Sequence, residues 1–236
     1  MNLIKTVSSF ILCTLIFSIA DAGTLKGHVK YDGKSPKKKR LKMDADPVCG
    51  SSHSGAVYGE NFKVSADGSM AEAIVYLKSV KYSDGAPSEP VVLDQKGCVY
   101  SPHVLGMVAG QELLIKNSDK TLHNIHSMPK VNKEFNFAMP KVVKEKKTTF
   151  KKSEPAPFYI KCDVHPWMKS WILVSDHPYY AVTDANGNFS IDGIPAGTYD
   201  IVCWQEKFKK RPLTGSVTIG SGESTKDFTF SRPKKK

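Results

Sequence analysis

The chain has 236 residues, a formal charge of +11 and 40% hydrophobic residues, a composition that fits one or two globular domains. A chain of this length can bury a core without help from disulfides. Its positive charge lacks interleaved aromatic residues, so nucleic acid is a poor fit as a partner.

The first predicted element is an export signal over residues 1–22. Lys5 gives a short positive start, residues 10–20 are almost unbroken in apolar character, and Ala20-Asp21-Ala22 has the small residues of a cleavage site. The apolar run is too short to span a bilayer comfortably, so we expect no membrane span in the mature form. Cleavage after Ala22 would give a periplasmic or secreted bacterial protein.

Residues 23–88 read as the first part of a β-structure. Residues 23–31 alternate apolar and polar side chains and end at a turn, and residues 73–77 form an apolar β run. Between them, residues 34–42 are strongly basic. Such a run is either a solvated loop or a docking patch.

Residues 89–176 show short apolar segments separated by polar turns, and no convincing helical period. This spacing indicates an antiparallel β-sandwich, so the predicted fold class is all-β. The expected strands are residues 91–93, 103–108, 112–116, 148–151, 158–161 and 171–174.

Residues 177–236 change character again and end in a basic tail. Asn186-Gly187 is a strong hairpin signal. Asp184 and Asn186 have the spacing of a calcium loop, but the closing Glu of an EF-hand is absent, so we expect a turn.

Soft metal ligands gather in one short stretch, Cys162 to Met168. It supplies a thiol, the imidazole of His165 and the thioether of Met168, and His123 follows an upstream apolar strand. Two imidazoles, a thiolate and a weak thioether suit both Cu(I) and Cu(II). The loop alone is also compatible with three core side chains on a turn, but a second ligand segment in the right order favours metal.

These two segments resemble the cupredoxins, the blue-copper fold of plastocyanin and amicyanin. The resemblance implies a Greek-key sandwich over residues 89–176 and one type 1 copper held by His123, Cys162, His165 and Met168. It also implies that Asn124 ties the two ligand loops together. In the family the equivalent of His165 reaches the surface, where Pro166 and Trp167 would surround its edge with an apolar docking patch for a redox partner.

The segment from Ala181 to Tyr199 resembles the carboxypeptidase regulatory-like, or transthyretin-like, β-sandwich. That family also has earlier strands like residues 27–31 and 73–77. We therefore expect the cupredoxin to be inserted into a second small sandwich made of residues 23–88 and 177–236. Three separate units are the alternative: contacts between residues 27–31 and 199–203 in one sheet would support insertion, and their absence would refute it.

The remaining cysteines and histidines leave alternatives open. In an oxidising compartment Cys49 and Cys98 are a candidate disulfide, and Cys203 reads as a small buried apolar residue. His126 is expected on the same strand face as His123, as a structural residue or an extra metal contact. His53 and His103 follow Cys49 and Cys98 at short spacing, so a second Cys/His metal site is conceivable.

The sequence therefore predicts an exported type 1 copper electron carrier that turns over no substrate. Its partner would be a redox protein such as a c-type cytochrome or a dehydrogenase, and the positive charge favours an acidic surface. One alternative is a copper-binding and delivery protein. The other is a structural surface module that carries a cupredoxin domain.

Overall fold

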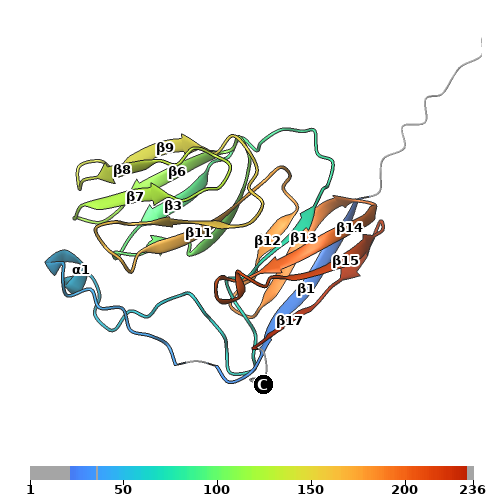
Figure 1. The fold of residues 1–236 in the computed structure, drawn as a ribbon, viewed down its shortest axis with the longest axis horizontal. Coiled ribbons are helices and arrows are strands. Elements are labelled where there is room, and N and C mark those ends of the chain that lie inside the picture. The colour runs from blue at the N-terminus through green and yellow to red at the C-terminus, as the bar shows by residue number, and fades with distance from the viewer. Residues whose placement is uncertain (1–21, 36, 233–236) are drawn as a thin grey trace, which may run out of the picture.

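A computed structural model describes residues 22–35 and 37–232, which form two β-sandwiches that lie side by side (Figure 1). The predicted signal, residues 1–22, lies outside the described residues except for Ala22. Within the described ranges, no helix is long and apolar enough to cross a membrane.

The central sandwich contains β3 to β11, arranged as two sheets in the orders β5-β11-β10-β7-β8 and β4-β3-β6-β9. Alternation along β6 shows how the core is filled, because Leu113 and Ile115 point inward while their neighbours are only partly buried. The strands are β3 (Val91–Gln95), β4 (Tyr100–Ser101), β5 (Val104–Val108), β6 (Glu112–Asn117), β7 (His123–Ser127), β8 (Asn136–Met139), β9 (Glu145–Thr149), β10 (Phe158–Lys161) and β11 (Lys169–Ser175).

The all-β sandwich architecture is confirmed, with differences of detail. Two pairs, β3 with β6 and β5 with β11, are parallel, so the central sandwich is mixed and not purely antiparallel. In the central sandwich three strands were not predicted, β4, β7 and β8, and the strand expected at residues 148–151 begins earlier, at Glu145, and ends at Thr149. The segment that forms β7 is rich in His and Asn, so it lacks the apolar, β-branched character that marks a strand in sequence.

The outer sandwich is built from both ends of the chain, in two sheets with the orders β13-β1-β16, with β17 also on β1, and β12-β2-β14-β15. In the second sheet Leu77 of β2 lies opposite Ile201 of β14, so residues from before and after the central sandwich pair directly. The strands are β1 (Ala22–Asp32), β2 (Ile74–Lys78), β12 (Tyr180–Val182), β13 (Asn188–Pro195), β14 (Gly197–Trp204), β15 (Leu213–Ile219), β16 (Glu223–Thr225) and β17 (Phe228–Ser231).

The expected pairing of residues 27–31 with 199–203 in one sheet is wrong. β1 and β14 lie in opposite sheets, and they meet only through the shared core, where Val29 and Ile201 are both fully buried. The sequence pattern identified inward-facing residues but not which of the two facing sheets each strand joins. The criterion was too narrow, because β1 pairs with β13 and β2 with β12 and β14, so strands from both ends of the chain do share sheets. The domain boundaries at residues 88 and 176 stay predictions.

Aromatic packing and one ion pair join the two sandwiches. The ring of Trp171 in β11 lies 4.9 Å from that of Trp204 in β14, and His103 contacts Glu206 at 2.8 Å. Glu206 belongs to the 3-10 helix η1 (Glu206–Phe208). A Cβ at Gly106 would lie 2.2 Å from the ring of Tyr180, so glycine permits the two units to approach closely here.

Residues 33–73 run from β1 across to the central sandwich and back to β2, and carry the short helix α1 (Pro47–Ser51) beside that sandwich (Figure 1). Asp46 caps α1, because its carboxylate accepts the N–H groups of Val48 and Cys49. Pro47 begins the helix, where its missing N–H costs nothing. We call residues 37–62 the cap segment.

Candidate metal centre

Three of the predicted ligands meet at one end of the central sandwich. His123 begins β7, and Cys162 and His165 lie in the loop between β10 and β11. The Nδ1 atoms of His123 and His165 are 3.0 Å apart, and the Cys162 Sγ lies 3.7 Å from the His165 Nδ1. All three donor atoms lie within 4.8 Å of one another, and all three residues are buried. A metal with N and S bonds of roughly 2.0–2.3 Å needs donors at about this spacing.

Hydrogen bonds from backbone N–H groups stabilise the loop from Cys162 to Met168. The N–H of His165 donates to the Cys162 Sγ at 3.3 Å, and the N–H of Met168 donates to the His165 carbonyl at 2.9 Å. The Cys162 N–H donates to the Met168 carbonyl at 3.3 Å. Met168 is 1% exposed and shares the apolar cluster that contains Cys162. The fourth predicted ligand is therefore buried in the same core as the thiol.

Asn124 joins the two ligand segments. Its side-chain oxygen accepts the N–H of Asp163 at 2.9 Å, which ties β7 to the residue after Cys162. Its carbonyl accepts the hydroxyl of the buried Tyr100. Contacts of this kind hold His123 and Cys162 at a fixed separation.

Each ligand histidine has a carboxylate on its outer nitrogen. The Nε2 of His123 lies 2.8 Å from Asp119, and the Nε2 of His165 lies 3.1 Å from Asp46. An ionised carboxylate only accepts hydrogen bonds, so Nε2 carries a proton on both rings, and the two Nδ1 atoms face each other beside the thiol. Two ring nitrogens and a sulfur that converge in a buried space need positive charge between them, which either a proton or a metal cation can supply.

The pKa shifts point to the same need for positive charge. Burial opposes protonation of His123, but its contacts with Asp119 and Cys162 outweigh burial and raise its pKa to about 9. Burial also opposes ionisation of Cys162, yet the contact with His123 and backbone N–H groups lower the pKa of the thiol. The site therefore favours a thiolate next to a positive charge.

The carboxylates are themselves held in place. Asp119 accepts the N–H groups of Gly97 and Cys98 at 2.7 and 2.8 Å. Asp46, besides capping α1, accepts the Thr121 hydroxyl at 3.0 Å. Sequence reasoning missed both acids. Asp119 stands four residues before His123, which is a weak local signal, whereas Asp46 is 119 residues from His165 and gave none.

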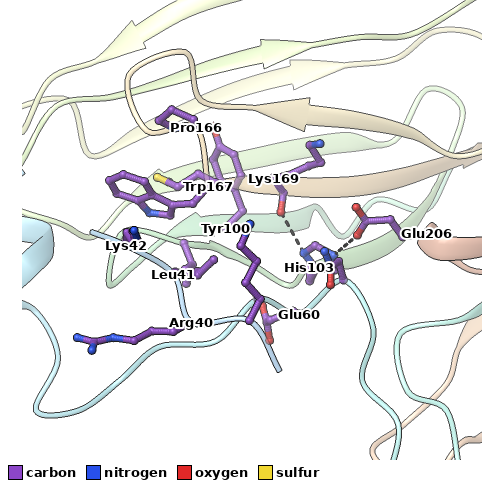
Figure 2. A pocket seen from close by; sticks show the side chains of 15 residues that line it. Arg40, Leu41, Lys42, Glu60, Tyr100, His103, Pro166, Trp167, Lys169 and Glu206 are labelled. Atoms are coloured by element: carbon purple, nitrogen blue, oxygen red, sulfur yellow. Dashed lines mark hydrogen bonds and ion pairs between the residues drawn. The ribbon is translucent and has the colours of Figure 1, made fainter. Parts of the chain in front are cut away.

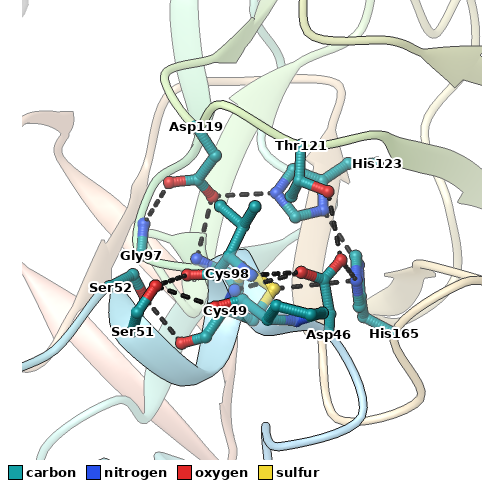
Figure 3. Close-up of a disulfide and its surroundings, with 12 residues drawn as sticks. Asp46, Cys49, Ser51, Ser52, Gly97, Cys98, Asp119, Thr121, His123 and His165 are labelled. Atoms are coloured by element: carbon teal, nitrogen blue, oxygen red, sulfur yellow. Dashed lines mark hydrogen bonds and ion pairs between the residues drawn. A yellow bond between two sulfur atoms is a disulfide. The ribbon is translucent and has the colours of Figure 1, made fainter.

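The expectation that His165 reaches the surface is wrong. Its side chain is 2% exposed, because the cap segment lies over it (Figure 3). Cys49 and Cys98 form a disulfide with Cα atoms 5.5 Å apart, and the Cys49 Sγ lies 3.6 Å from the His165 Nε2. The disulfide and Asp46 thus occupy the place where the imidazole edge was expected to meet solvent.

Other side chains of the loop do reach the surface. Pro166 is exposed and Val164 is 49% exposed, while Trp167 is half-buried. The Trp167 ring lies 5.1 Å from the ring of His165, and its Nε1–H donates to the Cys98 carbonyl at 2.9 Å. The loop therefore exposes apolar side chains at Val164 and Pro166, but His165 does not reach the surface beside them.

The second metal site and the extra contact at His126 are not supported. His126 is three residues after His123, so strand alternation places it on the opposite face, where it contacts Asp163 and Glu134 at 2.8 and 2.6 Å. His53 contacts the Gly97 carbonyl, and His103 contacts Lys169 and Glu206. The cysteines that precede these two histidines are joined to each other.

Comparisons with known proteins cover parts of the chain. The family model "Polysaccharide lyase family 4, domain II" matches residues 152–227, which span the end of the central sandwich and much of the outer one. This family is a fibronectin-like β-sandwich, and it differs from the carboxypeptidase regulatory-like family that the sequence motifs resemble. No curated protein matches the chain.

Several solved structures are similar to the chain, with low scores. A purple cupredoxin from Nitrosopumilus maritimus is 22% identical, with a TM-score of 0.30, over 36% of this chain and 99% of that one. A mutant of amicyanin in its Cu(I) form is 21% identical, with a TM-score of 0.32, over 43% and 98%. The copper-containing nitrite reductase of Thermus scotoductus SA-01 is 22% identical, with a TM-score of 0.32, over 42% of this chain and 25% of that chain.

Proposed function

We propose that the protein is an exported copper protein that carries single electrons between redox partners and turns over no substrate. The observation that carries the proposal is the convergence of His123, Cys162 and His165 within 4.8 Å in a buried space. Copper would supply a centre that gains and loses one electron, and Met168 would be its weak fourth ligand.

The donor set argues for copper over zinc. Zinc prefers four Cys, His or carboxylate ligands in a closed structural site. Here the charged and imidazole donors number three, and the remaining candidate is the soft thioether of Met168, which suits Cu(I). Asp46, Asp119 and Asn124 fix the ligands in one arrangement. A rigid arrangement suits electron transfer, because neither oxidation state then requires large movements of the ligands.

Export and the identity of the outer sandwich are parts of the same proposal. The Cys49–Cys98 disulfide suits an oxidising compartment such as the periplasm, in agreement with the predicted signal. The outer sandwich would be a carboxypeptidase regulatory-like domain made of residues 23–88 and 177–236. A c-type cytochrome or a dehydrogenase is the expected kind of partner.

Copper delivery is the main competing function, and the cap segment argues against it. Both imidazole ligands are buried and held by carboxylates, and the disulfide lies against His165. Metal transfer to another protein would require this covalently tied segment to move away. Reversible voltammetry of the copper-loaded protein, without loss of metal to an acceptor, would separate the carrier from a delivery protein.

The test is an absorption spectrum of the Cu(II)-loaded protein. We expect an intense visible thiolate-to-copper band that Cys162→Ser abolishes and the matched variant Cys203→Ala retains. Both are free cysteines, but Cys203 lies in the core of the outer sandwich. A colourless wild-type protein would contradict the proposal.

A further inference from the structure

The surface beside the ligand loop is a groove lined by positive charge. Two hollows, the larger about 640 Å³, share Lys39, Gly59 and Asn61 and so form one continuous depression. Its walls come from the cap segment, the ligand loop, and η1 with the residues that follow it; Figure 2 shows the larger hollow. The cations that line it are Lys37, Lys38, Lys39, Arg40, Lys42, Lys169, Lys207, Arg211 and Arg232.

These cations are available to a partner. Across residues 22–35 and 37–232, none of the nine lies within 4.0 Å of a carboxylate oxygen. Two acids also line the groove, but Glu206 is paired with His103 and Glu60 with Lys63. The groove therefore presents uncompensated positive charge, which attracts an anionic surface over long range.

Both Trp167 and the candidate ligand Met168 line the groove, but Met168 is only 1% exposed, so Trp167 presents the larger surface to a partner. His165 is closed off by Asp46 and the disulfide. Trp167 lines the groove, and its ring is 5.1 Å from that of His165. The bond from its Nε1–H to the Cys98 carbonyl fixes the ring in that position. Trp167 is thus an aromatic connection between the buried ligands and the cationic surface.

We propose that this cationic groove is the docking surface for an acidic redox protein, and that the electron passes through Trp167 instead of the edge of His165. With copper held by His123, Cys162 and His165, the reduced partner would lose one electron and the copper would gain it, with no bond made or broken and no proton transferred. The inference rests on the proposed function for its electron-transfer part. An acidic protein is favoured over a charged polymer, because only a partner with its own redox group gains from lying against Trp167.

Docking is tested without copper by paramagnetic mapping. Hexacyanochromate(III), an inert anion, should broaden amide signals of residues 37–42, 167–169 and 207–211 in the ¹⁵N-labelled, metal-free protein. Broadening centred instead on Lys141, Lys151 and Lys152, or spread evenly over all exposed lysines, would overturn the docking surface. Because this readout needs no metal, it can succeed or fail independently of the copper proposal.

Electron exchange is tested with the copper-loaded protein and two small oxidants. Hexacyanoferrate(III) should oxidise the reduced protein more slowly at higher salt, whereas cationic tris(phenanthroline)cobalt(III) should not be slowed. The triple variant Lys39→Glu, Arg40→Glu, Lys42→Glu should lower the hexacyanoferrate(III) rate at least about 10-fold. The matched variant Lys141→Glu, Lys151→Glu, Lys152→Glu has the same net charge and should lower it far less. Equal losses in the two variants would contradict a specific groove.

The role of Trp167 has its own control on the same loop. Trp167→Leu should slow exchange with hexacyanoferrate(III) about 10-fold or more while the hexacyanochromate(III) map is unchanged. Val164→Ala, on the exposed side of the loop, should leave the rate as it is. A Trp167→Leu protein with the wild-type rate would show that the electron takes another path.

Discussion

The two free cysteines of the described chain, one in each sandwich, show how surroundings decide chemistry. Cys203 in β14 is packed among apolar side chains, and burial raises the pKa of its thiol. Cys162 is also buried, yet His123 and backbone N–H groups lower its pKa. The two residues have the same side chain and nearly the same exposure. What differs is a set of polar groups aimed at one sulfur and absent from the other.

The strongest way to test this comparison is to remove each thiol in turn. Cys162→Ala should lower the affinity for Cu(I) by more than about 100-fold, because loss of a ligand should exceed the loss caused by an outer contact. Cys203→Ala should leave the affinity unchanged. Competition with a chromophoric Cu(I) chelator measures both, and equal affinities in the two variants would refute the difference between the thiols.

Cys49 and Cys98 differ from both free cysteines, because their disulfide ties the cap segment to the central sandwich. The double variant Cys49→Ala, Cys98→Ala should lower the free energy of unfolding by about 2–4 kcal/mol, the usual effect of a disulfide. Cys203→Ala is the control for simple loss of a buried sulfur. Urea denaturation gives the free energies, and an unchanged value in the double variant would mean that the cap segment is not held by this bond.

The polar groups around Cys162 can be weakened one at a time. Asp46→Asn and Asp119→Asn should each lower copper affinity about 10- to 100-fold, because the imidazole each acid holds loses its charged acceptor. Asp163→Asn is the matched control, since that acid adjoins Cys162 but contacts Lys161 and His126 instead of a ligand. A chelator titration in which all three variants behave alike would show that the outer contacts are unimportant.

The smallest expected effect concerns the contact that joins the two sandwiches. Burial opposes ionisation of Glu206, but its bond to His103 holds the pKa of the carboxyl below its usual value. The folded pKa is therefore below the unfolded one. The stability that this carboxylate contributes is present above the unfolded pKa, and it disappears as pH falls through the folded pKa.

Glu206→Gln should accordingly cost about 1 kcal/mol of unfolding free energy near neutral pH and much less in acid. Urea denaturation at several pH values measures the difference between the wild type and the variant. A difference that stays constant from neutral pH into acid would show that the charge of Glu206 does not stabilise the interface.

The sequence predicted best those features of the fold that depend only on residues close together in the chain. Alternation in residues 112–116 predicts a strand from neighbouring residues alone, and that strand is confirmed. Asn186-Gly187 does form a turn, but the expected hairpin is wrong, because β12 and β13 on either side of the turn lie in opposite sheets. The candidate ligand segments at His123 and at Cys162 to Met168 were also predicted from the sequence. Cys, His and Met side chains seldom occur so close together.

Long-range packing explains what the sequence did not reveal. Nothing near Asp46 indicates that it will lie on His165, since the contact depends on how residues 33–73 cross to the other sandwich. The same crossing buries His165, which a family resemblance alone predicted to be exposed. Likewise, β1 and β14 have the inward-facing pattern of sandwich strands, but the choice of sheet depends on pairing partners far along the chain.

X-ray absorption at the copper edge of the Cu(I)-loaded protein tests the central claim most directly. The account predicts one short copper–sulfur bond together with two imidazole nitrogen bonds, and loss of that short sulfur bond in Cys162→Ser. A copper environment made only of nitrogen and oxygen, unaltered by that substitution, would contradict it.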